Sequence, residues 1–108
     1  MTEHPICLIT GATDGVGKIT ALELARKGFT VVVAARNADK AEALKLEIET
    51  STTNNRTDYI VADLGSLGQV RQLAHTFRRR YSTLDVLVVE ARRTPVFRLT
   101  EMSVVRTA

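Results

Sequence analysis

A loop with three closely spaced glycines holds the residues whose types and spacing could do chemistry. An apolar run at residues 6–9 leads through Thr10 into Gly11, Gly15 and Gly17, with the spacing G-x-x-x-G-x-G. Gly11 permits a tight turn, Gly15 lets a ligand approach the backbone, and Gly17 lets the following helix pack against the strand. Unpaired backbone N–H groups and the positive end of a helix dipole attract anions. The loop therefore predicts a cradle for a dinucleotide pyrophosphate, with a plain strand-to-helix turn as the alternative.

The elements that must position this loop alternate between strands and helices. Apolar segments without polar alternation predict strands covered on both faces at residues 6–10, 30–35, 58–62 and 84–89. Apolar residues at helical spacing predict helices at residues 16–27, 38–50 and 67–81. Gly28 is placed to end the first helix, Asn37 and Ser66 are placed to cap the next two, and Gln69 is placed to complete a capping box with Ser66.

This alternation predicts an α/β fold. Short connections between strands and helices require parallel pairing through right-handed crossovers, which gives a partial Rossmann (doubly wound) sheet of order 3-2-1-4 with flanking helices. The ligand crevice then lies at the carboxyl ends of the first and fourth strands. The fourth strand is expected to be an exposed edge with unpaired backbone groups along its outer side.

Composition indicates one domain and no membrane segment. The 108 residues are 44% hydrophobic and 25% charged, which suits a single core. No apolar run approaches the ~18 residues of a membrane span, so we expect no membrane association and a cytoplasmic location. Cys7 falls within the first strand pattern and is expected to be a small buried hydrophobic residue. His4 and His75 have no partners at metal-ligand spacing, so no metal site is expected.

Clustered arginines raise the alternative of nucleic-acid binding. The run Arg78-Arg79-Arg80 lies at the carboxyl end of a predicted helix. The net charge is only +3, however, and no aromatic residues are interleaved with the arginines. The helix dipole also favours cations at that end. We therefore expect no nucleic-acid partner.

Four motifs, in their order and at their intervals, give the chain a family resemblance. They are the glycine loop at residues 10–17, Ala34-Ala35-Arg36-Asn37, Asp63-Leu64 and Leu84-Asp85-Val86-Leu87-Val88. Together they resemble the amino-terminal, cofactor-binding half of a short-chain dehydrogenase/reductase, with the retinol-dehydrogenase-like branch the most similar. The resemblance covers about residues 5–88.

The resemblance implies a nicotinamide-dinucleotide site and an oxidoreductase function. The implied cofactor-binding residues are Gly11, Thr13, Asp14, Gly15, Val16 and Gly17 at the pyrophosphate, Arg36 and Asn37 after the second strand, and Asp63 and Leu64 beside the adenine. Members that prefer NAD place an acidic residue at the end of the second strand, where this chain has Ala35. Arg36 can instead pair with a 2′-phosphate, which favours NADP(H) over NAD(H). The alternative for Arg36 is an ordinary solvated cation.

The sequence departs from the family after residue 88. Val89-Glu90-Ala91-Arg92 stands where the family has Asn-Asn-Ala-Gly, and whether this segment permits cofactor binding stays open. We interpret residues 1–88 as a dinucleotide-binding half-domain and residues 89–108 as a divergent tail.

The family's catalytic pair, a tyrosine with a lysine four residues later, is not found in these 108 residues. Tyr59 and Tyr81 are followed at that spacing by Asp63 and Asp85. Tyr81, at the end of an amphipathic helix, is interpreted as a packing residue. We therefore expect no catalytic residue here and a chain truncated before the Tyr-x-x-x-Lys centre.

Three functional interpretations follow. The first is the NADP(H)-binding portion of a short-chain dehydrogenase/reductase-like oxidoreductase. The second is a non-enzymatic interaction module whose exposed sheet edge pairs with a second copy or a full-length relative. The third is a non-functional partial product. No residue pattern names a substrate.

Overall fold

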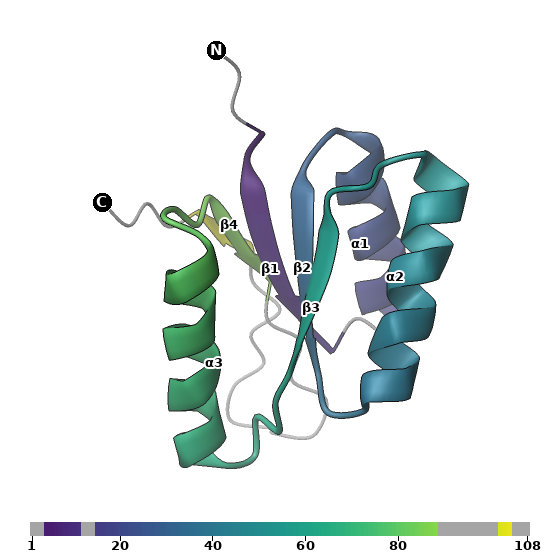
Figure 1. Cartoon of the computed structure of the whole chain (residues 1–108). Helices are drawn as coiled ribbons and strands as arrows, with labels where there is room; N and C mark the ends of the chain where they lie inside the picture. Colours follow the sequence, from purple (N-terminus) through teal and green to yellow (C-terminus); the bar gives the residue numbers. More distant parts are fainter. Residues whose placement is uncertain (1–3, 12–14, 89–101, 105–108) are drawn as a thin grey trace.

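The structure is a computed structural model, and it describes residues 4–11, 15–88 and 102–104. Its elements are β1 (Ile6–Thr10), α1 (Gly15–Arg26), β2 (Thr30–Ala35), α2 (Ala38–Thr52), β3 (Thr57–Val61), α3 (Leu67–Arg80), β4 (Val86–Val88) and β5 (Met102–Val104). The predicted alternation of strands and helices is confirmed, with most ends shifted by one or two residues (Figure 1). None of the described helices is long and apolar enough to cross a membrane.

The sheet has the order β3-β2-β1-β4-β5. β1 pairs in parallel with β2 and with β4, and β2 pairs in parallel with β3. The predicted Rossmann order 3-2-1-4 is therefore confirmed. The prediction that β4 is an exposed edge is wrong, because β5 pairs antiparallel with it and places Ser103 opposite Leu87. This strand comes from the segment interpreted as a divergent tail, and a strand of three residues has too short a pattern to be predicted.

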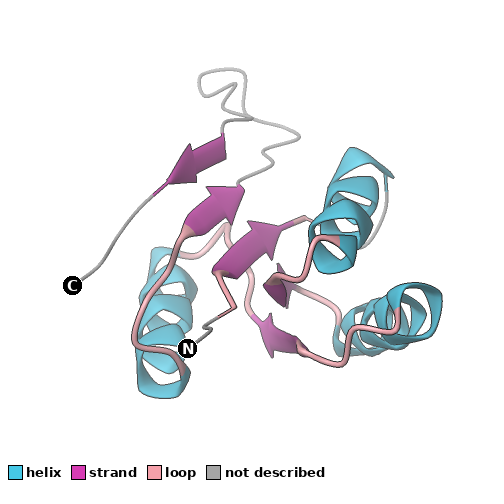
Figure 2. Ribbon diagram, turned by 90° about the horizontal axis from the view of Figure 1, so that it is seen from above, coloured by secondary structure: helices cyan, strands magenta, loops and turns pink. Residues whose placement is uncertain are grey.

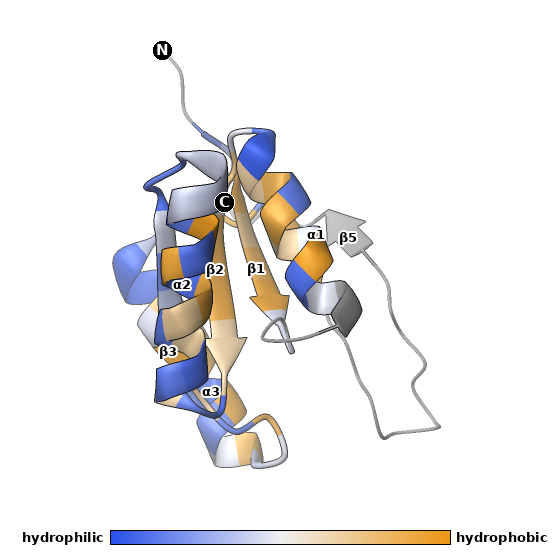
Figure 3. Cartoon of the chain, turned by 90° about the vertical axis from the view of Figure 1, so that its right-hand side faces the viewer, coloured by the Kyte–Doolittle hydropathy of each residue, from blue (hydrophilic) through white to orange (hydrophobic). Residues whose placement is uncertain are grey.

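The two faces of the sheet are covered unequally. Of the described helices, α1 and α2 pack on one face and α3 packs on the other (Figure 2). Alternate residues of the central strands point to opposite faces. The core beneath α1 and α2 contains Cys7, Ile9, Val31, Val33, Ala21, Ala25, Ala41, Leu44 and Ile48. The core beneath α3 contains Leu8, Val32, Ala34, Ile60, Ala62, Leu73 and Phe77. Figure 3 shows the corresponding apolar character of β1 and β2.

Side-chain caps begin α2 and α3. Asn37 Oδ1 accepts from the Lys40 N–H at 3.1 Å, and Ser66 Oγ accepts from the Gln69 N–H at 3.3 Å, so both predicted N-caps are confirmed. The second contact of the predicted capping box, from the Ser66 N–H to the Gln69 side chain, is wrong. Gln69 Oε1 accepts from the Asp63 N–H at 2.7 Å, whereas the Ser66 N–H donates to the Asp63 carbonyl at 3.1 Å. The backbone donor of Ser66 is thus already satisfied, which leaves Gln69 to hold the preceding turn.

The amino ends of the strands are held by side chains as well. β4 begins later than predicted, but Asp85 still joins it to β1: its N–H donates to the Ile6 carbonyl and its carboxylate accepts from the Ile6 N–H, both at 2.9 Å. Nearby, Gly28 has a φ of 93° and ends α1, as predicted. Asn54 is buried, and its Nδ2 donates to the carbonyls of Ala25 and Phe29 at 2.9 Å each. These contacts fix the edge of the sheet that lies opposite the strands' carboxyl ends.

Candidate functional site

The carboxyl ends of β1, β2 and β3 lie side by side at the edge of the sheet where α2 and α3 begin (Figure 1). Thr10, the last residue of β1, lies opposite Ala34 near the end of β2. After β3, the N–H of Ala62 donates to the Ala35 carbonyl at 2.9 Å. The chain therefore leaves the sheet at Gly11, Arg36 and Asp63 in adjacent positions. Three of the predicted cofactor-binding motifs meet at one edge, as a Rossmann fold requires.

The glycine loop has the turn that its sequence predicts. Gly11 has a φ of 67°, in the left-handed region where a side chain is strained, so the glycine is needed to turn the chain out of β1. α1 begins at Gly15, and its first turn contains no acidic residue to compensate the helix dipole. Gly17 is buried within α1. Of the other predicted loop residues, Thr13 and Asp14 and the side chain of Val16 lie outside what the structure describes.

Arg36 follows β2 directly and is exposed, whereas Ala35 before it is buried. Among the described residues, no carboxylate forms an ion pair with Arg36. Asn37 was also a predicted cofactor-binding residue, but the structure places its side-chain oxygen on the N–H of Lys40 as a helix cap. The oxygen of Asn37 therefore positions α2, and Arg36 presents an exposed guanidinium at the same corner.

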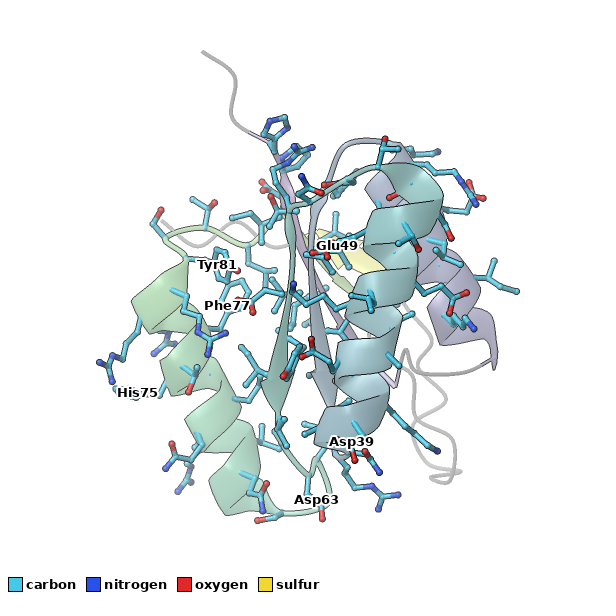
Figure 4. All side chains as sticks on the ribbon, turned by 45° about the vertical axis from the view of Figure 1, so that its right-hand side comes forward. Asp39, Glu49, Asp63, His75, Phe77 and Tyr81 are labelled. Atoms are coloured by element: carbon cyan, nitrogen blue, oxygen red, sulfur yellow. The ribbon has the colours of Figure 1, made fainter. Side chains whose placement is uncertain are left out.

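Asp63 and Leu64 form the turn that follows β3, at the end of the molecule where Figure 4 labels Asp63. The Asp63 Oδ1 accepts from the Gly65 N–H at 2.9 Å, and its own N–H is held by Gln69 at 2.7 Å. The turn is therefore fixed on both sides, and the side chain of Leu64 is left 39% exposed. Sequence reasoning missed this positioning role of Gln69, although the Ser66–Gln69 spacing singled the residue out.

The tyrosines are not placed as acid–base groups of this edge. Tyr81 lies at the other end of α3, where its ring is 5.0 Å from that of Phe77 (Figure 4). Its hydroxyl donates to Asp58 Oδ2 at 2.8 Å, and the same oxygen accepts from Arg80 Nη1 at 2.8 Å. Burial, reinforced by the hydrogen bond to Asp58, raises the pKa of Tyr81 to about 12. The interpretation of Tyr81 as a packing residue is confirmed.

Two further kinds of candidate are the thiol of Cys7 and side chains that could bind a metal ion. Cys7 is fully buried, and burial raises the pKa of its thiol to about 12. It therefore stays protonated and acts as the small hydrophobic residue that was predicted. In the part of the chain that the structure describes, no group of His, Cys, Asp and Glu side chains could hold a metal ion. The segment Val89-Glu90-Ala91-Arg92 lies outside the described residues.

Comparison with known proteins matches this arrangement. The family profile described as short chain dehydrogenase matches residues 5–107. Dehydrogenase/reductase SDR family member 13 from Homo sapiens is 40% identical over 84 residues, which are 78% of this chain and 22% of that protein. Retinol dehydrogenase 13 from Homo sapiens is 37% identical over 84 residues, which are 78% of this chain and 25% of that protein. The chain thus spans about a quarter of the length of these curated relatives.

The chain is also similar in fold to a protein of known structure. The Pseudomonas aeruginosa RhlG/NADP active-site complex superposes with a TM-score of 0.75 and 30% identity, over 85% of this chain and 36% of that one. The strand order and the packing of helices on the sheet are therefore features that this chain shares with a known fold. Together with the profile match over nearly its whole length, they show that the chain belongs to the short-chain dehydrogenase family.

Proposed function

We propose that this chain binds NADP(H) at the carboxyl edge of its sheet, as the cofactor-binding portion of a short-chain dehydrogenase-type oxidoreductase. The observation that carries the proposal is the exposed Arg36 beyond β2, with the buried Ala35 where a ribose-binding carboxylate would stand. A guanidinium matches the geometry and charge of a phosphate, whereas alanine offers the ribose hydroxyls no acceptor. The similarity to a protein solved with NADP supports the same coenzyme.

The residues around Arg36 fit the rest of the coenzyme. The positive φ of Gly11 and the first turn of α1, which lacks an acidic residue, suit the pyrophosphate. The exposed Leu64 offers an apolar surface to the adenine ring, on a turn that Gln69 and the Asp63 carboxylate keep in place. When bound, the nicotinamide ring supplies the hydride of an oxidoreductase. No Tyr-x-x-x-Lys pair occurs in these 108 residues, so these residues are assigned coenzyme binding and no catalytic step.

Calorimetric titration with NADPH and with NADH tests the assignment. A charge-assisted contact contributes about 1.5 to 3 kcal/mol, so NADPH should bind about ten- to a hundredfold more tightly than NADH. Arg36→Ala should remove most of that difference and leave NADH affinity nearly unchanged. Arg26→Ala is the matched control, because Arg26 is an exposed arginine at the end of α1, far along the helix from the cradle. Equal affinities for the two coenzymes, or a preference that survives in Arg36→Ala, would contradict the proposal.

A further inference from the structure

Three hydrogen bonds converge on Asp63, in the turn between β3 and α3. The Asp63 N–H donates to Gln69 Oε1 at 2.7 Å. The Asp63 carbonyl accepts from the Ser66 N–H at 3.1 Å, and the Asp63 Oδ1 accepts from the Gly65 N–H at 2.9 Å. The backbone on both sides of this residue is therefore held in one conformation at the carboxyl edge of the sheet.

Gln69 differs from the other two partners of Asp63, because it belongs to α3. Gly65 and Ser66 lie within two or three residues of Asp63, whereas Gln69 lies six residues along the chain in the first turn of the helix. The Gln69 N–H donates to the Ser66 Oγ at 3.3 Å, so the backbone of Gln69 is itself fixed by the helix cap. The buried Phe77 anchors α3 on the sheet. The Gln69 side chain therefore fixes the turn relative to the anchored helix.

The position of this turn decides where the next residue, Leu64, presents its side chain. Leu64 is 39% exposed, and it lines an apolar groove of about 610 Å³ beside α3. Thr10, the last residue of β1, lines the same groove. Leu64 thus adjoins the strand end that leads into the glycine loop. A flat apolar ring that binds at this edge meets Leu64 only where the turn holds it.

We propose that Gln69 is a positioning residue for the adenosine half of the coenzyme: through Asp63 it holds Leu64 where the adenine ring packs. This inference rests on the proposed function. Gln69 acts through the turn and needs no contact of its own with the coenzyme. Arg36 selects between the two coenzymes through the 2′-phosphate, whereas NADPH and NADH carry the same adenine ring. Gln69 should therefore set the affinity for both coenzymes by the same factor.

Two substitutions at Gln69 separate the hydrogen bond from the bulk of the side chain. Gln69→Met keeps the length of the side chain but removes the amide oxygen, and Gln69→Glu keeps an oxygen acceptor. In calorimetric titration, Gln69→Met should bind NADPH and NADH roughly three- to tenfold more weakly, the effect of one hydrogen bond, with the ratio of the two affinities unchanged. Gln69→Glu should bind both within about twofold of the unaltered chain. Gln72→Met is the matched control, at an exposed glutamine of the same helix.

Two further measurements place the effect at the turn and at the adenine. Amide hydrogen exchange of Gln69→Met should be faster at the Asp63 N–H and unchanged at the Tyr81 N–H, which donates to the Phe77 carbonyl at 2.8 Å near the other end of α3. Adenosine 2′,5′-bisphosphate contains the adenine ring but no nicotinamide. Its affinity should fall in Gln69→Met by the same factor as that of NADPH.

The possible outcomes distinguish this inference from the proposed function. If the unaltered chain binds neither coenzyme, the proposed function fails and this inference fails with it. If the unaltered chain binds NADPH and Gln69→Met binds it as tightly as Gln72→Met does, only the role of Gln69 is overturned. A changed ratio of NADPH to NADH affinity in Gln69→Met, or an equal loss of affinity in Gln69→Glu, would also overturn that role.

Discussion

At the scale of single residues, a substitution in the glycine loop should affect coenzyme affinity without affecting the fold. Gly15 begins α1 beside the expected pyrophosphate position, so Gly15→Val should lower NADPH affinity at least about a hundredfold while the circular dichroism spectrum stays unchanged. Gly68→Val is the matched control, because a Cβ at Gly68 meets only Ser66 Oγ, at 3.9 Å. Unaltered coenzyme binding in Gly15→Val would reduce the loop to a strand-to-helix turn.

Most of the candidate site could be predicted from residue types. Gly11 and Arg36 were identified because a tight turn and a phosphate-pairing cation each need a specific side chain or its absence. The capping of α2 by Asn37 was predicted too, and that cap competes with the role in cofactor binding that the resemblance implied for the same side chain. The contact between Gln69 and Asp63 was missed, because sequence spacing does not show that the Ser66 N–H already has an acceptor.

At the scale of elements, Asn54 joins the end of α1 to the start of β3. Its Nδ2 satisfies the carbonyls of Ala25 and Phe29, and its Oδ1 accepts from the Arg56 N–H at 2.8 Å. Asn54→Ala leaves these groups without their partner and should lower the free energy of unfolding by about 1–3 kcal/mol in urea denaturation. Asn55→Ala, at the exposed neighbouring position, should change it by less than about 0.5 kcal/mol. Equal effects of the two substitutions would show that Asn54 does not join these elements.

The contact between Asp58 and Tyr81, which ties the end of α3 to β3, predicts a dependence on pH. Burial opposes the charge on Asp58, but hydrogen bonds from Tyr81, the Tyr59 N–H and Arg80 outweigh it and lower the pKa. That stabilisation is present above the ordinary value of 3.8 and is lost as the pH falls through the lowered pKa. The pH dependence that comes from Tyr81 has the opposite direction, because its pKa is raised. Its contribution to the free energy of unfolding is complete below pH 10.0 and is lost as the pH rises toward about 12.

Tyr81→Phe tests this dependence by urea denaturation across the pH range. The substitution should lower the free energy of unfolding by about 1 to 2 kcal/mol near neutral pH, since it removes one hydrogen bond to a carboxylate at a half-buried position. The difference from the unaltered chain should shrink as the pH rises above 10.0. A difference that stays constant up to pH 12 would contradict the raised pKa of Tyr81.

The elements themselves could largely be predicted because the strands are apolar on both faces and the helices repeat their apolar residues at helical spacing. The β1–β2–β3 core and both N-caps are encoded locally, in residues close together in the sequence. β5 could not be predicted in this way. Its three residues pair with β4 across more than ten intervening positions, and no short pattern encodes such a contact.

At the scale of the whole molecule, α1 and α2 pack on one face of the sheet and α3 packs on the other. The predicted association with a second copy or a full-length relative through the edge of β4 loses its basis, because β5 occupies that edge. An apolar groove of about 610 Å³ lies beside α3, and its lining includes Thr10 and Leu64 from the carboxyl edge.

Binding of NADP(H) at the carboxyl edge of the sheet can be observed residue by residue in an NMR titration of the isotopically labelled chain with NADPH. We expect the largest amide shifts at Gly11, Arg36 and Leu64, and unchanged signals at Asn54 at the opposite edge. NADH should shift the Gly11 amide at higher concentration and leave Arg36 nearly unaffected. Shifts centred on Asn54 would contradict binding at the carboxyl edge, and an Arg36 amide that responds equally to both coenzymes would contradict the preference for NADP(H).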